Sequence, residues 1–195
     1  MLIAITGGIG SGKSVISQLL RIMGFPVYDC DARAKWVMTH DPILRQQLTD
    51  LFGAETYLPD HELNKPYLSA KIFNDSAALA QMNACVHPAV NRDLQRQYRQ
   101  LCPLPSDPFF FESAILFESG FDHLSLPDRI WTVSAPLELR IANAMQRDHA
   151  SRQQIISRMK AQMAQEEKEK RSDVIILNDM EHSIIQQVND AIISL

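Results

Sequence analysis

Residues 5–14 of the chain read ITGGIGSGKS. Four of the seven glycines in the 195-residue sequence fall in this stretch, next to a lysine and a serine. The letters GGIGSGKS match the pattern G-x-x-x-x-G-K-[ST], in which Gly7, Gly12, Lys13 and Ser14 occupy the fixed positions. Glycine reaches backbone conformations that turn several N–H groups toward one point, so such a loop can wrap around a phosphate group.

The residues on either side give this loop the surroundings that a phosphate-binding loop needs. Residues 2–6 (LIAIT) form a short apolar run that predicts a buried strand, and residues 13–23 predict an amphipathic helix that Gly24 ends. The helix would direct its free N–H groups and its dipole at the same anion. Lys13 would add positive charge near the β- and γ-phosphates, and the Ser14 hydroxyl would bind Mg²⁺. The alternative is a tight turn that needs glycine only for packing.

Further strand candidates alternate with helices along the chain. Five strands are predicted near residues 2–6, 25–28, 109–113, 129–135 and 173–177. This alternation predicts an α/β fold with a mostly parallel, five-stranded sheet. The mostly helical stretch at 32–102 is too long for a minimal crossover between strands, so we interpret it as an inserted helical subdomain.

An acidic pair, Asp29 and Asp31, directly follows the second predicted strand. Ligands of open α/β sheets collect at the carboxyl ends of the strands, where the phosphate-binding loop would also lie. A carboxylate there can accept a proton from an attacking hydroxyl group or hold Mg²⁺ through water. The alternative is that one of the two side chains caps a helix that begins at Ala32.

Residues 140–171 are polar, helical and basic, with a net charge of +4 against −8 for the rest of the chain. A basic helical pair after the fourth strand is typical of a lid whose arginines cover a transferring phosphoryl group and exclude water. We favour this role for Arg147 and Arg158, and a solvated helical face for Lys168 to Arg171. The core of the domain would then comprise about 1–31, 103–139 and 172–195.

The composition limits the partners and the compartment. A net charge of −4 and a pI of about 5.8 argue against general binding to nucleic acid or to an anionic membrane surface. Three widely spaced cysteines without a CxxC pair predict neither a disulfide framework nor a structural zinc site, and suit a cytoplasmic protein. No apolar run predicts a signal peptide or a membrane span. We expect a monomer or a small homo-oligomer.

Taken together, several stretches resemble the dephospho-CoA kinase family, in the family's order and over nearly the whole chain. They are TGGIGSGKS at 6–14, DCD at 29–31, LNKPYLSAKIFND at 63–75, CVHPAV at 85–90, ILFE at 115–118, MQRD at 145–148 and VIILN at 174–178. The resemblance implies a three-layer P-loop kinase fold with a CoA-binding helical insertion and a mobile lid. It also implies ATP-dependent phosphorylation of the ribose 3′-hydroxyl of dephospho-CoA, which gives CoA and ADP.

The resemblance also implies roles for individual residues. Lys13, Asp31 and Arg147 would be catalytic, with Asp31 as the base, and Ser14 would bind Mg²⁺. Asn178 lies where the family contacts adenine. The expected ATP site comprises Gly8, Gly10, Ser11, Gly12, Lys13, Ser14, Val15, Arg147 and Asn178.

The acceptor would contact Asp31, Lys35 and His87. The dipeptide His87-Pro88 lies between two predicted helical segments, where it could also simply end a helix. Several positions depart from the family's pattern. Lys35 replaces a histidine or arginine, Ala114 replaces the proline of D-x-P-L-L-F-E, and Arg140-x-x-Asn143 replaces Gln-x-x-Arg.

Three other readings remain. Another small-molecule P-loop kinase would share the donor site and differ in the insertion. A GTP-binding switch needs a guanine-reading N-K-x-D after a strand, whereas the last predicted strand leads into Asn178-Asp179-Met180-Glu181. A non-catalytic nucleotide-binding module would be less expected to keep both Lys13 and the acidic pair.

Overall fold

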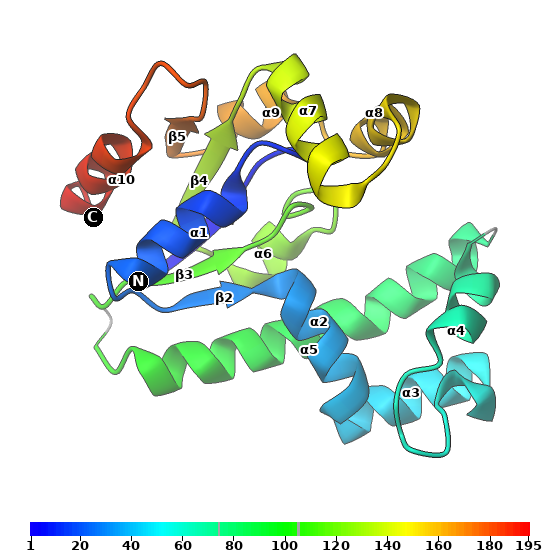
Figure 1. The fold of residues 1–195 in the computed structure, drawn as a ribbon. Coiled ribbons are helices and arrows are strands. Elements are labelled where there is room, and N and C mark those ends of the chain that lie inside the picture. The colour runs from blue at the N-terminus through cyan, green and yellow to red at the C-terminus, as the bar shows by residue number, and fades with distance from the viewer. Residues whose placement is uncertain (74, 105) are drawn as a thin grey trace. The chain divides into compact units, whose positions relative to one another are not determined.

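The structure, a computed structural model, describes residues 1–73, 75–104 and 106–195 (Figure 1). The chain divides into two compact units, which are described separately. The first comprises Met1–Asp29 together with Tyr98–Leu195, and the second comprises Cys30–Gln97.

A five-stranded sheet forms the centre of the first unit. Its strands are β1 (Leu2–Thr6), β2 (Val27–Asp29), β3 (Phe109–Glu112), β4 (Arg129–Ser134) and β5 (Val174–Leu177). The strand order is β2-β3-β1-β4-β5, and every neighbouring pair is parallel. This confirms the predicted α/β fold with its parallel sheet. β2 begins one residue after Pro26 rather than at residue 25, since proline has no N–H group to donate to the ladder.

Apolar side chains that alternate along the strands build a core on one face of the sheet. Helices α1 (Lys13–Ile22) and α10 (Ile184–Ile193) cover this face. Ile3, Ile5 and Trp131 of the strands pack with Ile16 of α1 and Val188 of α10, and all five are fully buried. This packing fixes the position of α1, and therefore of the loop that precedes it.

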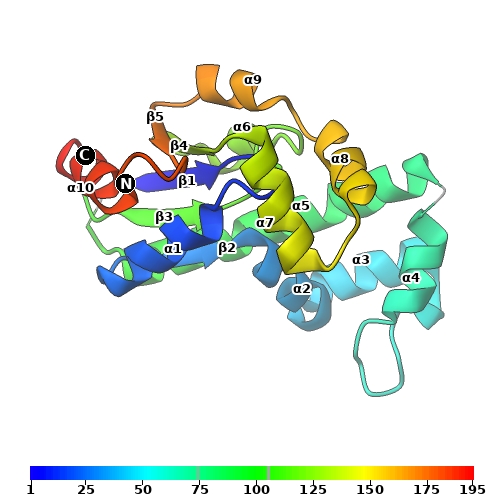
Figure 2. The ribbon, with the colours of Figure 1, turned by 45° about the horizontal axis from the view of Figure 1, so that its top comes forward.

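Other helices cover the opposite face. Phe111 of β3 contacts Phe121 of the short helix α6 (Phe121–Ser125), with ring centroids 5.9 Å apart. Helix α9 (Gln165–Lys170) lies on the same side, and Figure 2 shows α9 and α1 on opposite sides of the strands. The first unit therefore has three layers, with the sheet in the middle.

The predicted basic lid consists of short helices. Helix α7 (Leu137–Asp148) ends at His149, which adopts a left-handed conformation with φ 50°. Helix α8 (Arg152–Lys160) begins at a capping box, in which the Ser151 side chain and the Gln154 side chain satisfy each other's backbone N–H groups. Residues 161–164 then lead into α9.

The second unit is helical. It contains α2 (Cys30–His40), α3 (Pro42–Phe52), the 3₁₀ turn η1 (Ala54–Thr56), α4 (Lys65–Ile72) and the first 22 residues of α5 (Ser76–Leu101). Asp93 of α5 is 5% exposed and accepts two hydrogen bonds from Arg33 of α2, at 2.8 and 3.0 Å. These helices are therefore linked by buried polar contacts as well as by apolar packing.

The prediction that His87-Pro88 separates two helical segments is wrong, because α5 continues through both residues. An interior proline costs a helix about 3 kcal/mol through a lost hydrogen bond and a steric clash. Val86, Ala89, Val90 and Leu94 are buried on one face of α5, and this burial outweighs the local loss.

None of the helices in the described ranges is both long enough and apolar enough to cross a membrane.

Candidate active site

The loop between β1 and α1 has the geometry of a phosphate-binding turn. Helix α1 begins at Lys13, as the sequence predicts, and Gly12 precedes it in a left-handed conformation with φ 97°. Gly10 has φ 75°, and a Cβ atom there would lie 2.0 Å from the backbone oxygen of Arg140. Both positions therefore require glycine, for the left-handed conformation and for the closeness of their neighbours.

Several N–H groups of this loop remain available to a ligand. Within the described residues, the backbone N–H groups of Gly10, Gly12 and Ser14 have no hydrogen-bond acceptor. They lie at the N-terminus of α1, where the helix dipole favours an anion. The hydroxyl group of Ser14 is exposed and has no hydrogen-bond partner in the same part of the chain. The loop thus fits a phosphate group and offers one oxygen ligand for a metal ion.

Lys13 is held inside the loop. Its side chain is 8% exposed, and its ammonium group donates to the carbonyl oxygens of Gly7 at 2.9 Å and Gly8 at 3.1 Å. A buried ammonium group needs such acceptors to offset the loss of its hydration. The two carbonyl groups therefore fix the position from which Lys13 would meet a bound phosphate.

Helix α7 contacts the loop through two side chains that sequence reasoning did not assign to the site. Arg140 Nε donates to the carbonyl oxygen of Ile9 at 3.2 Å, and Asn143 Nδ2 donates to that of Gly10 at 3.1 Å. Arg140 is 8% exposed, and burial lowers the pKa of its guanidinium group. The sequence showed these positions only as departures from the family's pattern, since neither residue type by itself predicts contact with backbone carbonyl groups.

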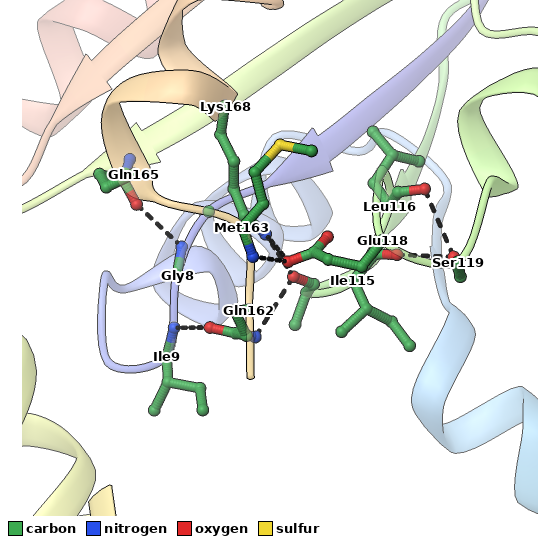
Figure 3. A network of polar contacts seen from close by, with 12 residues as sticks. Gly8, Ile9, Ile115, Leu116, Glu118, Ser119, Gln162, Met163, Gln165 and Lys168 are labelled. Atoms are coloured by element: carbon green, nitrogen blue, oxygen red, sulfur yellow. Dashed lines mark hydrogen bonds and ion pairs between the residues drawn. The ribbon is translucent and has the colours of Figure 1, made fainter. Parts of the chain in front are cut away.

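Two glutamines contact the same loop from the other side of the lid (Figure 3). Gln165 Oε1 accepts from the backbone N–H of Gly8 at 3.0 Å, and Gln162 Oε1 accepts from that of Ile9 at 2.9 Å. Neither glutamine stood out in the sequence, because glutamine on a polar helix is the usual residue of a solvated face. The lid segment is therefore bonded to the loop at four side chains: Arg140, Asn143, Gln162 and Gln165.

The expectation of a solvated face at Lys168 to Arg171 is wrong for Lys168, which is fully buried. Its ammonium group lies 2.7 Å from Glu118 Oε1 and donates to the carbonyl oxygen of Ala114 at 2.8 Å. Burial lowers the pKa of Lys168, and the ion pair with Glu118 opposes that effect. Glu118 also accepts from the Met163 N–H at 2.8 Å, so one carboxylate anchors both α9 and the residues before it (Figure 3).

Asn178 lies beside the loop, directly after β5. Its Nδ2 donates to the carbonyl oxygen of Ser11 at 2.9 Å, and a Cβ atom on Gly12 would touch the same side chain. The next residue, Asp179, accepts from the backbone N–H groups of His182 and Glu181, which lower its pKa to about 2. The segment after β5 therefore has its own local order next to the loop.

The lid arginines lie elsewhere in this structure. Arg147 and Arg158 both pair with Asp148, at 2.7 Å and 3.0 Å, and more than half of each arginine side chain is exposed. Asp148 has a lowered pKa, first because Arg147 donates hydrogen bonds to it.

The carboxyl ends of β2 and β3 carry two acidic residues. Asp29 and Glu112 are register partners on these neighbouring strands. Glu112 Oε2 accepts from the hydroxyl group of Ser17 in α1 at 2.6 Å. Glu112 was not assigned to the site from the sequence, although its position at the end of a strand is the signal that drew attention to Asp29.

The expected acceptor residues all belong to the second unit. Helix α2 begins at Cys30 rather than at Ala32, so Asp31 lies inside its first turn and is not the cap. Asp31 and Lys35 are exposed and one helical turn apart, and His87 is partly buried in α5. A cavity of about 310 Å³ in this unit is lined by other residues: Trp36, Val37, His40, Asp41, Pro42, Ile43, Arg92, Asp93 and Arg96.

The described residues contain no group of three or more histidine, cysteine, aspartate or glutamate side chains that could hold a metal ion. A Mg²⁺ ion commonly takes few protein ligands and completes its shell with substrate phosphates and water. The exposed hydroxyl group of Ser14 fits that kind of site.

These features define a P-loop nucleotide-binding fold of the kinase class. They are the parallel sheet, the glycine-rich loop whose N–H groups lack acceptors among the described residues, and the buried lysine at the start of α1. The family model for dephospho-CoA kinase matches residues 1–183, and the chain belongs to this family. The chain is therefore a kinase.

Known proteins agree with this assignment. A dephospho-CoA kinase of Bacteroides fragilis is 44% identical over 191 residues, which cover 97% of this chain and 90% of that protein. The crystal structure of TT1252 from Thermus thermophilus is 33% identical, with a TM-score of 0.79 and coverage of 100% and 95%. A dephospho-CoA kinase from Campylobacter jejuni, at 24% identity and a TM-score of 0.70, shares the fold over 99% of this chain and 96% of its own.

Proposed function

We propose that the chain transfers the γ-phosphoryl group of ATP to the ribose 3′-hydroxyl group of dephospho-CoA, which gives CoA and ADP. The observation that carries the donor half is the loop at Gly10, Gly12 and Ser14, whose N–H groups have no acceptor in the described part of the chain. The acceptor half rests on membership of the dephospho-CoA kinase family. We place the reaction in the cytoplasm and expect a monomer or a small homo-oligomer.

The donor site would act mainly through charge and position. The N–H groups of Gly10, Gly12 and Ser14 would bind the β- and γ-phosphates, and Lys13 would stabilise the negative charge on the transferring group. The carbonyl groups of Gly7 and Gly8 already hold the ammonium group of Lys13, so little reorganisation accompanies the reaction. Mg²⁺, held by Ser14 and the phosphates, would neutralise further charge. Asn178, beside Ser11, would lie toward the adenine end of the nucleotide.

The acceptor side would come from the helical unit at Cys30–Gln97. Asp31 would accept the proton of the ribose hydroxyl group as it attacks phosphorus. Asp31 lies in the first turn of α2 and is exposed to solvent. Lys35, one turn further on, and His87 would bind the anionic and polar parts of the acceptor. Arg147 would leave Asp148 and reach the phosphates when the lid closes.

A coupled ADP-release assay with ATP, Mg²⁺ and a panel of acceptors tests the proposal. ADP release should depend on dephospho-CoA, and the product should carry the new phosphate at the ribose 3′ position, as read by ³¹P NMR. Release with a nucleoside monophosphate or shikimate but not with dephospho-CoA would overturn the acceptor assignment. Release without any acceptor would indicate hydrolysis instead of group transfer.

A further inference from the structure

Two consecutive peptide groups of the loop are bonded on both sides. The group between Gly7 and Gly8 presents its carbonyl oxygen to Lys13 Nζ at 2.9 Å and its N–H to Gln165 at 3.0 Å. The group between Gly8 and Ile9 presents its carbonyl oxygen to the same Nζ at 3.1 Å and its N–H to Gln162 at 2.9 Å. A trans peptide group is planar and points its C=O and N–H in opposite directions. Each glutamine therefore lies behind a carbonyl group that holds the lysine.

The N–H groups that bond to the glutamines differ from those that a phosphate would use. Gly8 and Ile9 donate to the lid, whereas Gly10, Gly12 and Ser14 have no acceptor in the described ranges. The first half of the loop is thus occupied by protein contacts, and the second half is left for a ligand. This division indicates that the glutamines orient the loop and do not stand in for a phosphate.

Both glutamine side chains are themselves oriented. Gln165 Nε2 donates to the carbonyl oxygen of Val133 at 3.3 Å and to Glu169 at 3.1 Å. Gln162 Nε2 lies 3.4 Å from the carbonyl oxygen of Ala114. The backbone between the two glutamines is tied to Glu118 through the Met163 N–H (Figure 3). Their amide oxygens consequently face the loop with little rotational freedom.

We propose that Gln162 and Gln165 are positioning residues that set the location of the Lys13 ammonium group through the two peptide groups. Without them, both peptide planes can rotate, their carbonyl oxygens turn away, and Nζ moves relative to the transferring phosphoryl group. A misplacement of about 1 Å far from the reacting atoms can lower a rate by about 100-fold. A kinetic test of this inference rests on the proposed function, whereas the hydrogen bonds from which it is argued do not.

The test is the double variant Gln162→Met/Gln165→Met, which keeps the side-chain length and removes both amide oxygens. We expect kcat to fall about 10- to 100-fold while the KM for ATP rises only about threefold, since Lys13 matters most in the transition state. The control is Gln154→Met, which removes a glutamine of the same segment whose hydrogen bonds, among the residues that the structure describes, all lie within its own capping box. Its kcat should stay within about twofold of the native value. Should the double variant not fold, Gln162→Met alone serves, since in the described ranges the amide nitrogen of Gln162 makes a single, long contact of 3.4 Å.

A cycle with Lys13→Ala separates positioning from general stability. In that background the two methionines should change neither kcat nor the ATP dissociation constant by more than about twofold, because the residue through which they act is gone. Equal losses with and without Lys13, or a folded double variant with native kcat, would overturn the inference. Calorimetric ATP titration without acceptor gives the same comparison if turnover is too slow. If the unsubstituted chain binds ATP but does not phosphorylate dephospho-CoA, only the proposed function fails.

Discussion

Lys13 and Asp31 differ in their exposure to solvent. Lys13 is almost fully buried and keeps its place through two backbone carbonyl groups, so its position depends on the shape of the loop. Asp31 is exposed on the first turn of α2, where the helix dipole stabilises a negatively charged carboxylate. A donor-side charge must be fixed before the reaction, whereas an acceptor-side base must remain accessible to an incoming hydroxyl group.

Asp31→Asn tests the base at the scale of one residue. The amide keeps the size of the side chain but cannot take a proton, so kcat should fall about 100- to 10,000-fold. The ATP dissociation constant should stay within about twofold, because the donor site lies in the loop around Lys13. Steady-state kinetics and calorimetric titration give the two values. Asp50→Asn, an exposed acid of α3, serves as the control. Native turnover in Asp31→Asn would show that another group takes the proton.

Among the elements, α9 is the one whose role differs most from the pattern of its sequence. QEEKEK reads as a solvated helix, yet Lys168 is buried against Glu118 while Lys170 is 73% exposed. One ion pair, between a fully buried lysine and a partly covered glutamate, thus holds this polar helix next to the glutamines that contact the loop. Helix α7 also contacts the loop, because its Arg140 and Asn143 donate hydrogen bonds to backbone carbonyl groups there.

Removal of one partner of this ion pair should destabilise the protein. Lys168→Met leaves the partly covered Glu118 carboxylate, 17% exposed at its side chain, with the Met163 N–H as its one remaining partner among the described residues, and the free energy of unfolding in urea should fall by about 2 kcal/mol. The double variant Lys168→Met/Glu118→Gln should recover more than half of that loss, because no unpaired charge remains. On the same helix, Lys170→Met removes an exposed contact with Glu167 and should cost about 0.5 kcal/mol or less. Similar costs for the two lysines would contradict the anchoring role.

At the scale of the whole molecule, local signals predicted the fold and the donor loop well. The periodicity of the strands and helices, and the glycines at the left-handed positions of the loop, reflect interactions between residues close together in the sequence. The lid contacts could not be predicted in this way, because Gln162 and Gln165 bond to residues more than 150 positions away. The continuation of α5 through Pro88 escaped prediction for a similar reason, since tertiary burial outweighed a local rule.

The expected site residues also differ in how far local sequence signals could place them. Asn178 contacts the loop at Ser11, and its contact with adenine stays a prediction. Arg147 stays a prediction, since it pairs with Asp148 at the surface, and its role depends on a lid movement that periodicity does not encode. Asp31, Lys35 and His87 also stay predictions, because they belong to the helical unit and their role depends on an acceptor that no short-range sequence signal identifies.

Ligand binding should therefore be visible in the stability of the whole chain, and the metal contribution can be assigned to one hydroxyl group. ATP at about 100 times its dissociation constant stabilises a protein by about 2.7 kcal/mol, which for a chain of this size raises Tm by about 5 to 10 °C. We expect EDTA to reduce this shift in the native protein, because Ser14 and the phosphates would hold Mg²⁺ together. In Ser14→Ala the shift should be smaller and nearly independent of Mg²⁺, whereas Ser17→Ala, which removes the contact with Glu112, should keep the Mg²⁺ dependence. Differential scanning calorimetry with and without Mg²⁺ measures both effects. A full Mg²⁺ increment in Ser14→Ala would mean that the metal ion takes its protein ligand elsewhere.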